Sequence, residues 1–357
     1  MFLTSAQFDR YEETIRRAVQ WCRDHQKYLR EHQDLQGHYK APYMWNRVGD
    51  NRMCGLYRAL IHDRFLQPDG DFRMSPTVKG FVHFPCTGVN QYIYANGWLV
   101  VGLQSIGAYD IVQRAMPFIL HFQDPTHGGF YAAFNPTTGV MDPRLMDTSS
   151  TSSAGFACLA TGRIAEARRA GDFLLRVLEL QPDFKHLFFS CMKADGTLLT
   201  ELSGSENQWD ADGRKQKCLS GKADGGNELT WLIGKPTKFL SRLYIATGDK
   251  RYLDGAIRAF DFFYCLDERA WTNFASCKTM WAGSELYRLT GEKHFAETCV
   301  RLMEFYAQSQ QPEGHWIHTL WHKSNADQTL GWTSDITHEY VAEMSDVLTD
   351  FSDERAP

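Results

Sequence analysis

The sequence has no excess of positive charge and no long uncharged apolar run. Its 43 Asp and Glu residues outnumber its 38 Lys and Arg residues, so the formal net charge is −5. Proteins that bind a phosphate backbone present concentrated positive charge, and this composition therefore argues against nucleic acid as a partner. No stretch of about 18 uncharged apolar residues occurs, so no membrane partner is expected either.

A secretory signal and paired cysteines are also missing. Residues 1–33 are charged and patterned as a helix, without the apolar segment of a signal peptide, and we expect a soluble, cytoplasmic protein. The nine cysteines are scattered singly, with no C-x-x-C motif. Disulfides and structural zinc sites are therefore not expected, and most of the thiols should be buried and reduced.

Several catalytic motifs are absent, and each absence removes a class of enzyme. The sequence contains no G-x-S-x-G, H-E-x-x-H, G-x-x-x-x-G-K-[ST] or G-x-G-x-x-G pattern. This argues against a serine hydrolase, a zinc peptidase, a P-loop enzyme and a dinucleotide-dependent enzyme. The D-D-x-x-D and D-x-D-D motifs of terpene synthases are missing as well. The chemistry that remains is acid–base catalysis without a cofactor or metal ion, or catalysis by the shape of the cavity alone.

The sequence does contain a repeated turn between helical segments. Five times an apolar helical run ends at a glycine and a second amphipathic run soon begins; the glycines are Gly49, Gly107, Gly162, Gly248 and Gly291. Glycine is favoured after a helix because it adopts a left-handed conformation without strain. The residues eleven and twelve positions after each glycine are apolar in all five copies, as expected for one buried helical face.

The repeat predicts twelve helices in one domain that spans residues 1–357. One helix precedes each glycine, another follows it, and a single helix stands at each end of the chain. The expected ranges are 6–31, 39–48, 50–64, 92–106, 109–123, 148–160, 163–180, 227–246, 249–266, 276–289, 293–309 and 334–349. Pairing the last helix with the first closes a ring of six helical hairpins, and short β-hairpins are expected near 128–139 and 187–196.

This arrangement resembles the (α/α)6 toroid of N-acylglucosamine 2-epimerases, unsaturated glucuronyl hydrolases and related six-hairpin enzymes, and terpenoid cyclases use a similar toroid. Residues 124–130 also look like the D-x-x-x-G-G-F segment common in the sugar-acting families. The resemblance implies an all-α, (α/α)6 fold over nearly the whole chain. It implies a reaction far less directly, because one fold supports many kinds of chemistry.

In such a toroid the helices before the glycines form the inner wall. Their N-terminal starts then surround the open mouth of a cavity, and the glycine turns lie at its closed end. The starts are rich in aromatic and polar residues, which stack on sugar rings, hold apolar substrates or stabilise carbocations. We expect a small-molecule substrate to contact Tyr39, Tyr43, Trp45, Tyr92, Asn96, Trp98, Asp147, Trp231, Trp281 and Trp332. The segments 128–131 and 204–212 are expected to cover the mouth.

Five polar residues on or beside the inner wall are candidate catalytic groups. They are Glu228, Lys235, Lys278, Asp335 and His338. A polar side chain in a wall helix must be paired or must face the cavity, and a group that faces the cavity is available for acid–base chemistry. Asp147 has the alternative role of a helix N-cap. Asp50 directly follows a glycine turn, and we interpret it as a capping residue.

Three functions fit these features. The first is a cofactor-independent cyclase or isomerase of secondary metabolism that folds an isoprenoid- or polyketide-like substrate in an aromatic cavity, with a pericyclase as the limiting case. The alternative is a carbohydrate-active six-hairpin enzyme, a sugar epimerase or an unsaturated-uronide hydrolase, in which His338, Asp335, Glu228 or Asp147 supplies the acid or base. The third is a groove that holds a protein or peptide without chemistry. The aromatic, weakly charged helix starts favour the first.

Overall fold

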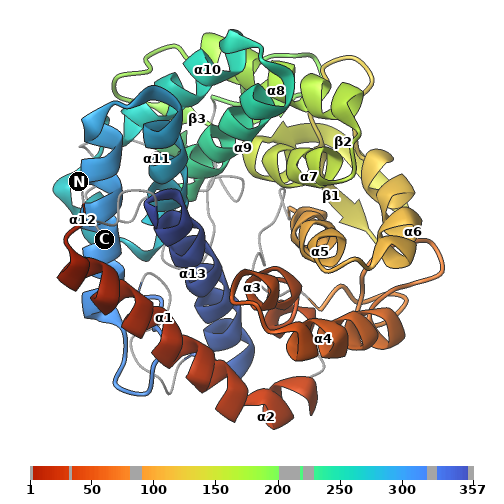
Figure 1. The fold of residues 1–357 in the computed structure, drawn as a ribbon. Coiled ribbons are helices and arrows are strands. Elements are labelled where there is room, and N and C mark those ends of the chain that lie inside the picture. The colour runs from red at the N-terminus through yellow and green to blue at the C-terminus, as the bar shows by residue number, and fades with distance from the viewer. Residues whose placement is uncertain are drawn as a thin grey trace.

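The computed structural model describes residues 3–31, 34–80, 91–200, 218–219, 229–319 and 328–352. Within these residues the chain forms two concentric layers of helices (Figure 1). The inner helices are α3 (Ala41–Arg47), α5 (Tyr94–Ser105), α7 (Thr148–Ala160), α9 (Trp231–Thr247), α11 (Cys277–Thr290) and α13 (Leu330–Asp350). The outer helices are α1 (Ser5–Asp24), α4 (Asn51–Arg64), α6 (Tyr109–Leu120), α8 (Ile164–Glu179), α10 (Lys250–Asp261) and α12 (Lys293–Ser309).

The inner helices form a closed ring. Each packs against the next along the chain, and α13 contacts α3 as well as α11. On the outside, α1 lies against α13 and beside α12, where Arg10 forms an ion pair with Glu304 at 2.6 Å. The result is the (α/α)6 toroid expected from the sequence (Figure 1). All twelve predicted helices are present, and the first is divided at His25 into α1 and the short helix α2 (Gln26–Glu31).

The repeated glycines adopt the backbone conformation that the turn requires. All five have φ between 70° and 76°, in the left-handed region that favours glycine. The helix that follows is capped as predicted at two of these turns. Asp50 accepts a hydrogen bond from the Met53 backbone N–H at 3.1 Å, and Asp249 accepts one from Arg251 N–H at 3.1 Å. Asp50 is therefore a capping residue.

The two layers differ in how they are buried. Of the ten repeat residues that follow the glycines, nine are buried and Leu60 is half-buried, so each outer helix presents one apolar face to the inner ring. The inner helices are buried on nearly all sides and approach one another through small residues. A Cβ at Gly97 would lie 2.2 Å from Ser153 Oγ, and a Cβ at Gly234 would lie 2.6 Å from Lys278 Cβ. Glycine thus permits the close α5–α7 and α9–α11 crossings.

Small β-structures lie between the helices. The predicted hairpin near 128–139 is present as β1 (Tyr131–Asn135) and β2 (Val140–Asp147), paired antiparallel. The hairpin predicted near 187–196 is present at its turn, since Met192 and Leu198 pair antiparallel across residues 194–196, but Phe188 and Phe189 pair elsewhere. β4 (Cys191–Lys193) also pairs with β2. β3 (Phe188–Phe189) pairs with β5 (Cys218–Leu219). A strand of two residues is too short to show an alternating pattern in the sequence.

The state of the cysteines agrees with their scattered placement. Cys22, Cys54, Cys158, Cys191, Cys265, Cys277 and Cys299 are free thiols, and all of these but Cys265 are buried. No helix in this part of the chain is both long and apolar enough to span a bilayer. The sequence likewise contains no stretch of about 18 uncharged apolar residues.

A matched pair of glycine substitutions tests the turn assignment. Gly291→Ala should lower the free energy of unfolding by about 1 kcal/mol, because a Cβ is strained at φ 73°. Gly55→Ala, in the exposed middle of α4 with open space around it, should instead raise it by about 0.5–1 kcal/mol. Urea unfolding measures both, and equal effects of the same sign would contradict the assignment.

Candidate functional site

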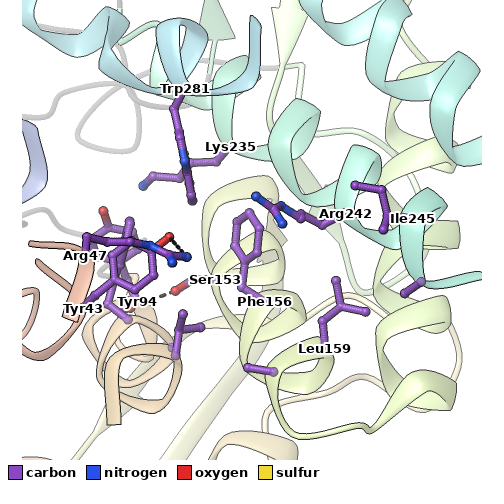
Figure 2. Close-up of a pocket in the computed structure, with 15 residues that line it drawn as sticks. Tyr43, Arg47, Tyr94, Ser153, Phe156, Leu159, Lys235, Arg242, Ile245 and Trp281 are labelled. Atoms are coloured by element: carbon purple, nitrogen blue, oxygen red, sulfur yellow. Dashed lines mark hydrogen bonds between the residues drawn. The ribbon is translucent and has the colours of Figure 1, made fainter. Parts of the chain in front are cut away.

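A pocket of about 300 Å³ lies inside the inner ring (Figure 2). Its walls come from α3, α5, α7, α9 and α11. The residues that line it are Tyr43, Arg47, Tyr94, Gly97, Trp98, Val101, Ser153, Phe156, Leu159, Ala160, Lys235, Arg242, Ile245, Ala246 and Trp281. Most are aromatic or aliphatic, as in pockets that bind small organic molecules. Among these described lining residues none is acidic.

The pocket extends to the end of the ring that carries the glycine turns. It begins at Tyr94 and Lys235, near the starts of their helices, and continues to Ala160 and Ala246, in the last turns of α7 and α9. The lining side chains become more exposed in that direction, up to 47% at Ile245. The expectation that the turns close the cavity is therefore wrong for this pocket, because its lining reaches exposed side chains at that end.

Aromatic rings form one wall of the pocket. Trp98 stacks on Trp281 with ring centroids 5.9 Å apart and an angle of 24° between the planes, and Tyr43 meets Trp98 edge-on at 5.6 Å. Two of these rings are held by the same carboxylate, since Tyr43 OH and Trp281 Nε1 donate to Asp346 at 2.7 and 2.8 Å. The wall is thus a fixed platform against which the flat face of a ligand can stack.

Lys235 is the ionisable residue of the pocket with no acidic partner. It is 4% exposed, its Nζ donates to Ser149 Oγ at 2.8 Å and lies 3.8 Å from the centroid of the Tyr94 ring. No described carboxylate forms an ion pair with it. Burial, followed by the positive charge of Lys278, holds the pKa of Lys235 well below its usual value. Its amine therefore loses its proton at a lower pH than that of an ordinary lysine, and the neutral form can accept a proton.

A local backbone feature places Lys235. The next residue, Pro236, lies inside α9 and has no N–H to donate to the carbonyl of Leu232. Thr148 Oγ1 from α7 donates to that carbonyl instead, at 3.4 Å. The neighbouring glycine, Gly234, brings α11 close on the other side. These two contacts seat the start of α9 between α7 and α11 and direct Lys235 toward the ring axis.

Five buried charges form a network behind the pocket, and we call it the ion network. It consists of Lys40, Lys278, Asp335, Glu339 and Glu343. Lys40 Nζ lies 2.7 Å from Asp335 and 2.9 Å from Glu339, and Lys278 contacts both Glu339 and Glu343. Lys278 Nζ is also 4.6 Å from the centroid of the Trp98 ring, which lines the pocket. The network therefore lies directly against the pocket wall.

The ion network has two lysines and three carboxylates, a formal charge of −1. Burial raises the pKa of Asp335 and of Glu343 above the usual range. Burial alone would raise the pKa of Glu339 too, but Lys278 and Lys40 outweigh it and hold that pKa low. One extra proton on Glu343 or Asp335 would neutralise the network, so it can store a proton beside the pocket.

One part of this network has the donor set of a metal site. The ligand atoms of Cys277, Glu339 and Glu343 all lie within 4.8 Å of one another. However, Lys278 occupies the position of a cation between the two glutamates, and burial together with the negative charge of Glu343 raises the pKa of the Cys277 thiol well above its usual value. A metal ion would have to displace the Lys278 ammonium and the thiol proton.

The structure brings several of the predicted site residues together. Tyr43, Trp98, Lys235 and Trp281 line the pocket. Lys278 and Asp335 belong to the ion network. Tyr39 lies between the two, with its ring edge-on to Tyr94 at 5.9 Å and Lys40 Nζ 4.9 Å from its centroid. The Trp231 ring is 5.7 Å from Lys235 Nζ.

Other predicted residues lie away from the pocket. His338 is fully buried against Tyr57 of α4, and burial lowers its pKa to about 3, so its ring is neutral. Trp45 also faces the outer layer, under Arg23 of α1. Asp147 caps α7 by accepting from Ser150 N–H at 2.7 Å, and burial raises its pKa.

The remaining predictions concern the edges of the ring. Tyr92 and Asn96 both donate to the buried carboxylate of Asp71, at 2.6 and 2.8 Å, in the segment that follows α4. Trp332 is half-buried in the first turn of α13. Glu228 and the segment 204–212 lie outside the described residues.

Sequence reasoning missed the two arginines of the pocket. Arg242 follows Lys235 by seven residues, which places both on one face of α9, so the spacing could have indicated it. Arg47 directly precedes a glycine turn and was set aside with the end that was expected to be closed. Glu343 continues the i, i+4 spacing of Asp335 and Glu339, which is the signal that could have revealed it.

Comparisons with known proteins support the fold. No family model and no curated protein matches the sequence. Among solved structures, a D-mannose isomerase matches with a TM-score of 0.64 and 11% identity over 88% of this chain and 87% of its own. A sugar epimerase from a ruminal bacterium matches with a TM-score of 0.60 and 11% identity over 88% and 87%. A variant of the type II terpene cyclase MstE from Scytonema matches with a TM-score of 0.57 and 12% identity over 98% and 100%.

Replacing Lys235 tests whether its amine is neutral. Lys235→Met keeps the apolar stem and removes the buried amine, so it should raise the free energy of unfolding at pH 7 by about 1 kcal/mol. Because the folded pKa lies below the unfolded one, the unfolded chain binds the extra proton between the two values, and wild-type stability rises with pH in that window. The difference between variant and wild type should therefore shrink toward pH 10.

Urea unfolding at pH 7 and pH 9.5 measures this effect. Lys250→Met, at an exposed position in the first turn of α10, is the matched control and should change stability by less than about 0.5 kcal/mol. A variant Lys235→Met that is less stable than the wild type at pH 7 would show that the amine is charged and paired.

Proposed function

We propose that this protein is a cofactor-independent isomerase, in which Lys235 removes a proton from a carbon next to a carbonyl group of a small molecule and returns it to another position. The observation that supports this most directly is the placement of Lys235. It is a buried amine that lines the pocket, has a lowered pKa and is not neutralised by any described carboxylate. A base of this kind accepts a proton near neutral pH, whereas an ordinary lysine is already protonated.

The surroundings of Lys235 suit such a transfer. The Trp98–Trp281 wall offers a flat surface on which a substrate can stack, and the pocket is largely closed to water at the Lys235 end. The proton taken up by Lys235 would sit 3.8 Å from the centroid of the Tyr94 ring, whose π-face stabilises an ammonium.

The fold comparisons support a sugar as the first candidate substrate. D-Mannose isomerase and the sugar epimerase are named for rearrangements of carbohydrates, and each such rearrangement exchanges a proton on carbon. This favours the carbohydrate alternative over the cyclase function that the sequence analysis preferred. The acid–base residue proposed for it changes, because Lys235 lines the pocket whereas His338 faces Tyr57 of the outer layer.

A cyclase of an apolar substrate is the second candidate. The pocket lining is mostly aromatic and aliphatic, and the terpene cyclase aligns over 98% of this chain and 100% of its own. A cyclase that starts by protonating an alkene needs a strong acid, however, and the described lining offers none. The second candidate is therefore a reaction driven by substrate folding, with proximity supplying the rate.

Proton exchange in D₂O tests the main proposal. The protein is incubated with D-mannose, D-glucose and D-fructose, and ¹H NMR follows product formation and loss of the proton next to the carbonyl, at C2 of the two aldoses and at C1 of D-fructose. We expect deuterium to enter the product of at least one sugar, and Lys235→Met to slow this by about 10²-fold or more. The rate should rise with pH and level off above the lowered pKa of Lys235, well below 10.5.

Lys250→Met is the control and should react at the wild-type rate. Undiminished exchange by Lys235→Met would contradict the assignment of the base. Conversion of an isoprenoid substrate such as geranylgeranyl hydroquinone without exchange on any sugar would support the second candidate instead.

A further inference from the structure

Two arginines reach into the pocket from opposite sides of the ring. Arg47 lies at the end of α3 and Arg242 on α9, and these helices occupy opposite positions among the six inner helices. Figure 2 shows both guanidinium groups directed toward the middle of the pocket, with Phe156 between them. The two side chains are 37% and 39% exposed, so each remains accessible to a ligand.

Each arginine is fixed by a carboxylate outside the pocket lining. Arg47 Nε pairs with Asp346 at 2.8 Å, and its Nη2 donates to Tyr43 OH at 3.0 Å. Arg242 Nε pairs with Glu285 at 2.5 Å. A guanidinium has five N–H donors, so Arg47 keeps three and Arg242 keeps four that these contacts do not use. These contacts orient both guanidinium groups and leave their remaining N–H donors facing the pocket.

The charges around these arginines do not balance. Glu285 is shared between Arg242 and the buried Lys238, which lies 3.3 Å from it. Asp346 balances Arg47 alone among the described cations. One positive charge therefore remains at this end of the pocket, and no acidic residue among the described lining offsets it. A surplus of positive charge in a partly buried site favours the binding of an anionic ligand.

We propose that the Arg47–Arg242 pair binds an oxyanion of the substrate, a carboxylate or a phosphate ester. That the oxyanion belongs to the substrate rests on the proposed function. That the two arginines bind an oxyanion does not depend on it. Both guanidinium groups can grip two oxygens at once. Lys235 and Arg242 are seven residues apart on α9, a rise of roughly 10 Å. The oxyanion and the reacting carbon therefore occupy opposite ends of the substrate, with its middle against the Trp98–Trp281 wall.

Matched pairs of ligands test this proposal. D-Mannose is compared with D-mannose 6-phosphate and D-mannuronate, and dodecan-1-ol with dodecanoate, by calorimetry on the full chain. We expect an anionic member of at least one set to bind roughly tenfold or more tightly than its neutral counterpart, and this preference to weaken as salt is raised. The phosphate and carboxylate arms show which oxyanion is preferred.

Variants locate the anion. Arg242→Gln should remove most of the preference, and its fold should persist because Glu285 retains Lys238 and Ser241 as partners. Arg242→Lys should keep part of the preference, since it keeps the charge but not the fork. Arg288→Gln is the control, because Arg288 pairs with Asp350 outside the pocket lining. Its ligand binding should equal that of the wild type.

The outcomes separate this inference from the proposed function. Lys235→Met should still prefer the anion while it fails to exchange protons, which would place binding and chemistry on different residues. If neither set shows an anion preference, or if Arg242→Gln and Arg288→Gln bind the anion equally well, the inference is overturned. A loss of exchange chemistry alone, with the anion preference intact, would count against the proposed function only.

Discussion

The closure of the helical ring depends on a buried network of charges. Asp335, Glu339 and Glu343 lie along α13, and they meet Lys40 at the start of α3 and Lys278 on α11. Ion pairs of this depth gain little net stability over apolar packing, but removing one partner leaves a buried charge and costs about 3–5 kcal/mol. Such a network therefore specifies the register between the last inner helix and its two neighbours more than it adds to stability.

The chemistry of the pocket also depends on the burial of charged groups away from water. Lys235 shares the wall with the ion network but receives no carboxylate of its own among the described residues, so burial shifts it toward the neutral amine. Arg47 and Arg242 stay charged, because a guanidinium does not lose its proton under these conditions and each has a carboxylate behind it. One pocket thus contains a lysine with a lowered pKa at its buried end and two guanidinium groups at its exposed end.

The sequence predicted the fold well and the site only in part. The five glycine turns and the apolar positions after them predicted all twelve helices, because helix ends and buried stripes are encoded by residues close together in the chain. The aromatic wall residues Trp98 and Trp281 and the buried Lys235 were also expected to face the pocket, and all three line it. His338 and Trp45 were expected at the site, yet they face the outer layer, since a helix turns by about 100° per residue and residues close in sequence therefore point to different sides.

By itself, the sequence determined the helices, their order around a ring and the kinds of residue on the inner wall, because helical periodicity and capping act within a few residues. Tertiary structure alone decided which polar groups pair with one another and which remain available. Lys278 and Lys235 are both lysines on adjacent inner helices, yet one is neutralised by two glutamates of α13 and the other is not. That difference depends on distances between helices far apart in the chain, and it shifts the pKa values of the two buried lysines in opposite directions.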